Sequence, residues 1–369
     1  MNATSADAPT RLAISNHALR LSGGIERYAL TLVRGLHERG VRPWLIAKAF
    51  DRQLPEYGWV EPVHAGVSGV PGKLRDLFFD WRIGRAKRRL DLFPLIGCNQ
   101  TRWSDIAICG STHPGYLEAM GERAGGVDRM KIALERAHLA NAAIVVAHSA
   151  RMKAEAVRHH GIDPAKITLL YPPVDGARFS PVDEPARAAL RQWLGLPADR
   201  AVFLLASTGH RRKGLDQAAA FFAATALPAT LVVAGRPMQR SVPNVAFLGY
   251  RHDMEDVYRA VDFTVLASLY EPFGLVSVES VLSGTPVLVA EGAGCAEVIR
   301  EPALLPFSLT EPASLGAAVA AATERWRQDR HRLERPASLL AYDPGVAPHV
   351  DALLALVRSL IEAHGSRGT

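Results

Sequence analysis

Short apolar runs alternate with amphipathic segments along the whole chain. The runs have the length and the Val, Ile and Leu content of buried strands, while the segments between them repeat apolar residues at helical spacing. The predicted strands cover residues 11–15, 41–49, 91–97, 104–110, 141–149 and 166–175, and then 201–207, 229–235, 245–250, 263–268 and 285–290. Strands that alternate with helices in this way predict parallel sheets covered by helices on both faces.

A stretch rich in Pro, Asp and Gly, residues 172–187, separates two series of predicted strands and indicates a domain boundary. We therefore expect an α/β fold of two doubly wound, Rossmann-like domains, residues 1–175 and 176–345, that face each other across a cleft. A length of 369 residues suits two cores of this kind. The final amphipathic segment, 346–369, predicts a helix that packs back on either domain.

The composition excludes several classes of protein. The chain is 48% hydrophobic and has only three cysteines, none in a CxxC pair, which argues against a disulfide framework or a Cys-rich zinc site. No apolar run is long enough for a membrane span, and residues 1–11 lack the pattern of a signal peptide, so we expect a cytoplasmic protein. Residues 1–180 hold 25 Lys and Arg against 17 Asp and Glu. This excess favours an anionic partner, and a solvated basic surface explains it equally well.

Ligands of doubly wound sheets bind beyond the carboxyl ends of strands, so loops after strands hold the candidate chemistry. The first such loop, LSGGIERY over 21–28, places Gly23 and Gly24 before a predicted helix. Paired glycines let a phosphate approach the free N–H groups of the helix start. The pattern is neither a GxGxxG nor a P-loop, and taken alone it is better explained as an ordinary helix start with Glu26 as a first-turn acid.

A second loop, STGHRRKGLD over 207–216, carries a cluster of cations. Arg211, Arg212 and Lys213 come just before Gly214, where a helix is predicted to begin. Fixed cations beside a helix N-terminus would hold a diphosphate and stabilise it as a leaving group. The alternative is a solvated basic loop, which the position at the end of a strand makes less attractive.

The third loop contains two acids eight positions apart. In EPFGLVSVE, Glu271 precedes a helix predicted to start near 273–275, and Glu279 lies about one turn inside that helix. One carboxylate is placed to bind hexose hydroxyls and the other a ribose diol, while the backbone N–H groups of Gly274 and Leu275 meet the phosphates between them. The competing interpretation makes Glu279 a helix-surface residue and Glu271 a first-turn acid.

One histidine and several absent motifs complete the picture. His113, in CGSTHPGY, follows a predicted strand of the first domain, although the chain has 13 histidines and a lone one is often structural. The sequence contains no DxD, GxSxG, HExxH or GxxxxGK[ST] pattern, and the GxG within 291–297 is a poor dinucleotide signal. We therefore predict no metal site and no metal requirement.

The chain resembles retaining glycosyltransferases of the GT-B fold, in family 4, almost from end to end. The resemblance rests on GGIERY, VVAHSARMKAEAVRHHGID, ITLLYPPVD, RRKGLD, VAFLGYRHDMEDVYRAVDFTVLAS and the E-x7-E motif EPFGLVSVES. Within the family, LLYPPVD and RRKGLD look most like bacterial lipopolysaccharide core glucosyltransferases. A nucleotide-diphosphate sugar is then a co-substrate, and no further cofactor is expected.

The resemblance implies roles for individual residues. His113, Arg212, Lys213 and Glu271 are the implied catalytic set, and Glu26 and His113 the implied acceptor contacts. His113 resembles the family's active-site histidine, but the lipopolysaccharide core enzymes often have an Asp in this loop, where this chain has GSTH, so Ser111 and Thr112 stay alternatives to His113. The implied donor-binding residues are Gly23, Gly24, Arg212, Lys213, Gly249, Tyr250, Glu271, Phe273, Gly274, Leu275 and Glu279, with the base near Gly249 and Tyr250.

We therefore predict a retaining, metal-independent hexosyltransferase, with UDP-glucose the favoured donor and a glycan such as the lipopolysaccharide core as acceptor. The N-terminal domain would bind the acceptor and the C-terminal domain the donor, and no nucleic acid is involved. The alternatives are a sugar-nucleotide epimerase of the same fold, an enzyme acting on a small soluble acceptor, an NAD-dependent oxidoreductase and a non-catalytic sugar-binding module.

Residues 72–93 form a basic segment with seven Lys and Arg interleaved with aromatic and aliphatic residues. On a helix this pattern predicts docking to an anionic membrane at the inner face of the plasma membrane. Burial of Phe78, Phe79 and Trp81 in the domain core is an equally good interpretation.

Overall fold

The computed structural model describes residues 11–238 and 240–366, which form two compact units. The first unit comprises the chain up to Pro173 together with the segment from Gly345 onward, and the second comprises Val174–Pro344. The final segment therefore returns to the first unit. Residues 1–10, on which the signal-peptide prediction depends, lie outside the described residues.

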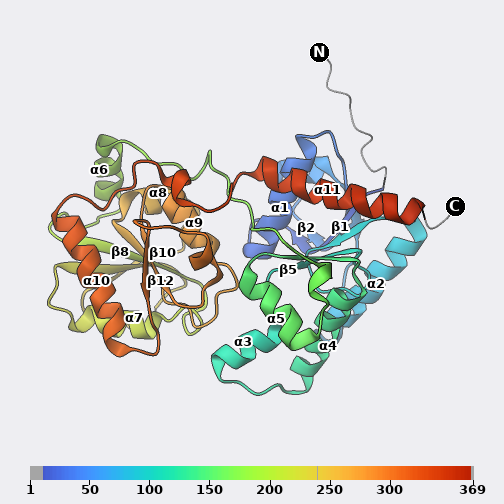
Figure 1. Cartoon of the computed structure of the whole chain (residues 1–369), viewed down its shortest axis with the longest axis horizontal. Coiled ribbons are helices and arrows are strands. Elements are labelled where there is room, and N and C mark those ends of the chain that lie inside the picture. Colours follow the sequence, from blue (N-terminus) through green and yellow to red (C-terminus); the bar gives the residue numbers. More distant parts are fainter. Residues whose placement is uncertain (1–10, 239, 367–369) are drawn as a thin grey trace, which may run out of the picture. The chain divides into compact units, whose positions relative to one another are not determined.

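The first unit is built on a seven-stranded parallel sheet with strand order β3-β2-β1-β4-β5-β6-β7 (Figure 1). Its strands are β1 (Ala13–Leu19), β2 (Trp44–Phe50), β3 (Glu61–His64), β4 (Leu95–Gly97), β5 (Ile106–Cys109), β6 (Ile144–Ala147) and β7 (Ile167–Leu169). Its α-helices are α1 (Gly24–His37), α2 (Arg75–Leu90), α3 (His113–Met120), α4 (Gly126–Asn141), α5 (Ala150–His160) and α11 (Val346–Gly365). The strand order reverses between β1 and β4, which makes their carboxyl ends the expected ligand site of this sheet.

The last helix completes the core of the first unit. Val350, Leu353 and Val357 of α11 are fully buried in one cluster with residues of α1 and β1. Gly35 of α1 allows this packing, because a Cβ atom there would lie 2.6 Å from Cγ2 of Val350.

The second unit is built on a six-stranded parallel sheet with order β10-β9-β8-β11-β12-β13. Its strands are β8 (Ala201–Ser207), β9 (Ala229–Gly235), β10 (Val245–Gly249), β11 (Phe263–Leu266), β12 (Val287–Ala290) and β13 (Leu304–Phe307). Its α-helices are α6 (Glu184–Trp193), α7 (Leu215–Ala224), α8 (Met254–Ala260), α9 (Leu275–Leu282) and α10 (Pro312–Arg327). Here the order reverses between β8 and β11. The prediction of two doubly wound parallel sheets is confirmed.

The sequence pattern missed two strands, β3 and β13. Each lies at the edge of its sheet, and each contains a proline, Pro62 or Pro306. Proline removes a backbone donor and is tolerated in edge strands, so both segments lack the appearance of a buried strand.

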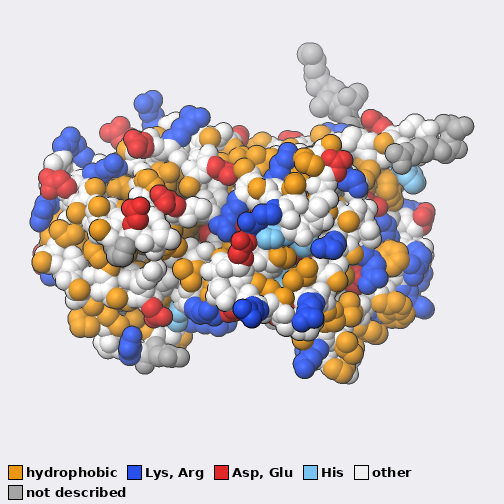
Figure 2. Space-filling view, turned by 60° about the horizontal axis from the view of Figure 1, so that its bottom comes forward, with side chains coloured by type: hydrophobic (Ala, Val, Ile, Leu, Met, Phe, Trp, Pro, Cys, Tyr) orange, Lys and Arg blue, Asp and Glu red, His pale blue; other side chains and the backbone are white. Residues whose placement is uncertain are grey.

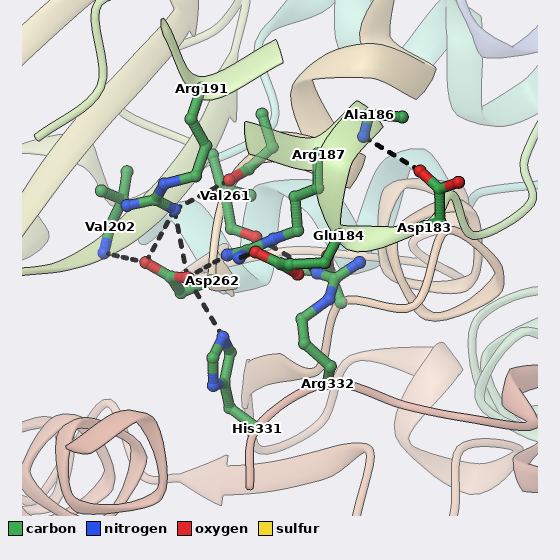
Figure 3. Close-up of polar contacts among 12 residues, drawn as sticks. Asp183, Glu184, Ala186, Arg187, Arg191, Val202, Val261, Asp262, His331 and Arg332 are labelled. Atoms are coloured by element: carbon green, nitrogen blue, oxygen red, sulfur yellow. Dashed lines mark hydrogen bonds and ion pairs between the residues drawn. The ribbon is translucent and has the colours of Figure 1, made fainter. Parts of the chain in front are cut away.

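A buried carboxylate fixes α6 to the second sheet (Figure 3). Asp262, which is fully buried just before β11, accepts hydrogen bonds from Arg187 and from Arg191 at 3.1 Å, and its Oδ1 lies 3.1 Å from Nε2 of His331. The backbone N–H of Val202 donates to it at 2.8 Å. Burial by itself would raise the pKa of Asp262, but the hydrogen bond with His331 and the nearby arginine charges lower it below its usual value.

The substitution Asp262→Asn is expected to lower the free energy of unfolding by about 3–5 kcal/mol, because it leaves buried arginine charges without their counterion. Urea unfolding at neutral pH measures the loss. The matched control is Asp199→Asn, where the side chain is 76% exposed and lies 3.6 Å from Arg200; a change within about 0.5 kcal/mol is expected there.

The pH dependence of the free energy of unfolding, compared between wild type and Asp262→Asn, gives a second measurement. A carboxylate with a depressed folded-state pKa contributes stability above its unfolded pKa of about 3.9, and the contribution is lost as pH falls through the folded value. The difference in free energy of unfolding between wild type and Asp262→Asn should therefore become smaller as the pH falls below about 4. A difference that stays constant across that range would contradict this account.

Candidate functional site

The reversal of strand order in the second sheet brings two loops together. One loop follows β8 and contains Arg212 and Lys213, and the other follows β11 and contains Glu271. The backbone N–H of Leu269 donates to the carbonyl of Arg212 at 2.8 Å, and the Arg212 guanidinium donates to the carbonyl of Tyr270 at 3.0 Å. The loops are thus hydrogen-bonded to each other at the expected ligand edge of the sheet.

Gly214 makes the close approach of these loops feasible. It caps the N-terminus of α7 with φ of 66°, a left-handed conformation that favours glycine. A Cβ atom on Gly214 would lie 2.0 Å from the carbonyl oxygen of Ala267, in the second loop. Any side chain here would therefore push the two loops apart.

Glu271 is the centre of the resulting charge cluster. It is 8% exposed, and its Oε2 lies 2.5 Å from the Lys213 ammonium and 3.6 Å from the Arg212 guanidinium, while the Ser268 hydroxyl donates to it at 2.9 Å. Burial would raise the pKa of Glu271, but the charges of Lys213 and Arg212 outweigh burial and lower it. The residue is therefore an ionised carboxylate at neutral pH.

The cluster keeps binding capacity for a ligand. All the contacts above fall on Oε2, and Oε1 of Glu271 makes no hydrogen bond to any residue that the structure describes. Two cations face one carboxylate, so the group carries net positive charge at the N-terminus of α7, whose dipole adds to it. This arrangement can hold an anion with the cations and can accept a hydrogen bond from a hydroxyl group at Oε1.

The second acid of the E-x7-E pattern lies on the helix, as predicted. α9 begins after Gly274, which has φ of 104°. Glu279 is buried within α9, and the Tyr258 hydroxyl donates to its Oε2 at 3.1 Å. Phe273, at 5% exposure, packs at the helix start against the ring of Tyr342. Leu275 is the first residue of α9, so its N–H group is among the free donors of the helix start.

Gly249 and Tyr250 lie farther from this cluster in the topology. Gly249 ends the edge strand β10 and Tyr250 follows it, and β10 is separated from β8 by β9. Tyr250 is 57% exposed and its ring contacts His252. The assignment of these residues to a base stays a prediction.

In the first unit, the predicted site residues lie near the β1/β4 reversal. Gly23 is the N-cap of α1, which begins at Gly24, and a Cβ on Gly23 would lie 3.1 Å from Oε2 of Glu26. Glu26 thus lies against the glycine pair. The loop that follows β5 carries His113.

His113 opens α3 and is held by two acids. Its Nε2 lies 2.9 Å from Oδ1 of Asp128, and its backbone N–H donates to Glu135 at 2.9 Å. Of its alternatives, Thr112 is fully buried, and its hydroxyl caps α3 at the N–H of Gly115 and bonds Glu155. Thr112 therefore has a structural role here, while Ser111 is half-buried.

His113 also lines a cavity of about 230 Å³ in the first unit. The other lining residues are His17, Asp76, Phe79, Gln100, Lys131, Leu134 and Glu135. Sequence reasoning missed these residues, which come from β1, α2, the loop after β4 and α4 and form no motif. One signal was available, since β1 carries three consecutive polar residues, Ser15, Asn16 and His17, inside a buried strand. Among the described residues no group of three or more His, Cys, Asp or Glu is arranged to hold a metal ion.

Comparison with known proteins shows the family of this chain. Residues 22–178 match the protein-family model described as Glycosyltransferase Family 4, and residues 200–329 match Glycosyl transferases group 1. A protein of Burkholderia thailandensis named as a probable transglycosylase is 47% identical over 348 residues, which are 94% of this chain and 96% of that protein. The chain belongs to glycosyltransferase family 4.

Solved structures agree on the fold of this glycosyltransferase. WaaG, a glycosyltransferase involved in lipopolysaccharide biosynthesis, superposes with a TM-score of 0.72 at 17% identity, over 88% of this chain and 96% of WaaG. Anabaena HepE in complex with UDP and glucose superposes with a TM-score of 0.75 at 16% identity, over 95% and 99%. The predicted GT-B fold and the prediction that the chain is a glycosyltransferase are confirmed. In the described part of this glycosyltransferase, no helix has both the length and the apolar content of a bilayer span.

Gly214→Ala in this glycosyltransferase is expected to lower the free energy of unfolding by about 1–3 kcal/mol, because alanine is strained at this φ and its methyl group meets the Ala267 carbonyl. The displaced loop should also weaken binding of UDP. Thermal unfolding with and without UDP measures both effects.

Gly209→Ala, in the same loop, is the matched control. A Cβ there meets nothing within 4 Å, and Gly209 has no positive φ, so wild-type stability and UDP response are expected. Equal behaviour of the two variants would show that the loop contact at Gly214 is not needed.

Proposed function

We propose that this glycosyltransferase moves a hexose, with UDP-glucose as the first donor to test, to a cell-envelope glycan such as the lipopolysaccharide core, with retention of the anomeric configuration. The observation that carries the proposal is the cluster of Lys213, Arg212 and Glu271 with its open Oε1. The solved fold relatives HepE, bound to UDP and glucose, and WaaG, involved in lipopolysaccharide biosynthesis, support the choice of donor and acceptor class.

The geometry suits departure of a nucleoside diphosphate. Lys213 and Arg212 would hold the diphosphate oxygens and stabilise the charge that grows as the bond from the anomeric carbon to the phosphate oxygen breaks. Glu271 would accept a hydrogen bond from a donor-sugar hydroxyl at Oε1, and Glu279 would hold the ribose. The acceptor hydroxyl would attack from the same face and give its proton to the leaving phosphate, so the step needs no carboxylate nucleophile and no metal ion.

The two units would divide the substrates between them. The second unit would hold the donor, because it carries the diphosphate cluster. The first unit would hold the acceptor near Glu26 and His113, and Asp128 would orient the His113 ring through the 2.9 Å contact with Nε2. An epimerase of the same fold would act without an acceptor, so dependence of product formation on acceptor separates the two functions. The second form of the proposal is a glycosyltransferase that acts on a small soluble acceptor instead of a lipid-linked one.

We further propose that α2 docks the enzyme on anionic membranes. Phe79 and Ile83 of α2 are buried in the core of the first unit, but Trp81 of α2 remains about half exposed, as does Leu74 just before the helix. Arg85, Arg88 and Arg89 are exposed on the same helix. Figure 2 shows Lys and Arg side chains interspersed with apolar ones on the surface of the first unit. Exposed apolar and basic side chains on one helix favour an interfacial binding mode.

Lys213→Ala is expected to lower turnover about 100- to 1,000-fold, which corresponds to about 3–4 kcal/mol of lost transition-state stabilisation. The assay follows release of UDP from UDP-glucose in the presence of envelope glycan acceptor, with EDTA throughout. Circular dichroism and thermal unfolding verify that the variant folds.

The control for Lys213→Ala is Arg327→Ala, which removes a half-exposed cation on α10 of the same unit and should leave turnover unchanged. Near-normal turnover of Lys213→Ala would overturn the role given to the cation cluster. Wild-type activity that appears only when Mg²⁺ or Mn²⁺ exceeds the EDTA would overturn the metal-independent step.

Membrane docking predicts flotation of the enzyme with vesicles that contain phosphatidylglycerol, at low salt. Each exposed cation near the surface contributes about 1 kcal/mol, so reversal of Arg85, Arg88 and Arg89 to Glu should abolish flotation. Lys87 is left intact, because it bonds Asp105 at 2.6 Å within the fold. Reversal of Arg129 and Arg136 on α4 is the control with exposed cations of the same unit. No flotation of the wild type at low salt would favour a soluble acceptor.

A further inference from the structure

The cavity of the first unit lies where the order of its sheet reverses. His17 belongs to β1, and Gln100 follows β4, so the two strands of the reversal each supply one wall. Asp76 comes from the start of α2, and Lys131 from α4. A site assembled at the carboxyl ends of these strands has the position in which doubly wound sheets bind ligands.

Polar groups of this cavity are left open for a ligand. The Gln100 side-chain amide makes no hydrogen bond to another described residue, and Nδ1 of His17 is buried without a partner. Phe79 and Leu134 add an apolar wall. An amide, an imidazole and a carboxylate beside an apolar wall match a sugar ring, which has hydroxyls along its rim and C–H groups on its faces. The volume of about 230 Å³ is below the roughly 300–1,000 Å³ of pockets for drug-sized ligands, and so suits a single ring.

The charges of the cavity decide which ring it accepts. Two carboxylates, Asp76 and Glu135, line it against a single ammonium group, Lys131. Lys48 adds a second cation beside the cavity but is bound to Asp76 at 2.8 Å. The Glu135 carboxylate already accepts a hydrogen bond from the His113 backbone N–H and contacts Nε2 of His160. It therefore contributes negative charge to the cavity but is not assigned a hydroxyl of the ligand. Burial lowers the pKa of His17, which is therefore no anion-binding cation at neutral pH. A phosphate would lose its hydration here without a net positive charge in return.

We propose that this cavity binds one uncharged sugar ring of the acceptor. Gln100, His17 and Asp76 hold its hydroxyls, and the carboxylates of Asp76 and Glu135 reject a phosphorylated ring. The inference rests on the proposed function, because it assigns an acceptor role to the first unit. It adds the charge class of the ring that enters the site and the residues that select it.

Saturation-transfer NMR with methyl glucoside, methyl galactoside, methyl mannoside and the corresponding hexose 6-phosphates tests the proposal on the full-length enzyme. At least one neutral glycoside should bind, and the 6-phosphates should bind more weakly. Gln100→Ala should weaken the neutral ligand about fivefold or more, as expected for loss of a hydrogen-bonding partner. Gln53→Ala, which removes an exposed amide elsewhere in the same unit, is the matched control and should bind as the wild type does.

The substitution Asp76→Asn tests the charge selectivity of the cavity, which would not change if Asp76 only stabilised the fold. Removal of one carboxylate should raise the affinity for a 6-phosphate relative to its neutral parent by about fivefold or more. No binding of any neutral glycoside, a wild-type preference for the 6-phosphates, or an unchanged preference in a folded Asp76→Asn variant would each overturn the proposal. UDP-glucose binding, measured by thermal shift on the same samples, reports on the donor site separately. Absence of UDP-glucose binding would count against the proposed function, while binding of a neutral glycoside would still support a sugar site in this cavity.

Discussion

The ion pair between Lys213 and Glu271 is the contact on which the second unit's site depends. It joins two loops that are far apart in sequence and meet only because β8 and β11 are neighbours where the strand order reverses. The partners are about nine-tenths buried, so the pair is desolvated before any ligand arrives. Buried charges that are already oriented need little reorganisation when charge develops on a bound group, which is the condition for strong electrostatic stabilisation.

The two sheets use the same topological position in different ways. At the β8/β11 reversal the loops present cations at a helix N-terminus, a surface suited to phosphate. At the β1/β4 reversal they present an amide, an imidazole and carboxylates around a small cavity, a surface suited to hydroxyls. One fold can therefore provide a subsite suited to an anion and a subsite suited to an uncharged group by changing loop residues alone, as is common for doubly wound folds.

The site residues that the sequence predicts stand in short local patterns. Arg212 and Lys213 are adjacent and follow a strand whose first six residues are apolar, and Glu271 is marked by its spacing from Glu279. Local pattern was therefore enough to predict these positions. The cavity residues His17, Asp76, Gln100 and Lys131 are spread over β1, α2, a loop and α4. No spacing rule connects such residues, because their proximity results from tertiary packing. The edge strands β3 and β13 were missed for a local reason, since each contains a proline and is only partly covered.

The location of α11 has a consequence for the order in which the protein is made. The core of the first unit includes Val350, Leu353 and Val357, which are synthesised after every residue of the second unit. On the ribosome the second unit can thus complete its own core while the first unit still exposes the apolar face of α1 that α11 will cover. The N-terminal half of the chain must wait for the last helix, and this waiting form is the species that chaperones would encounter during translation.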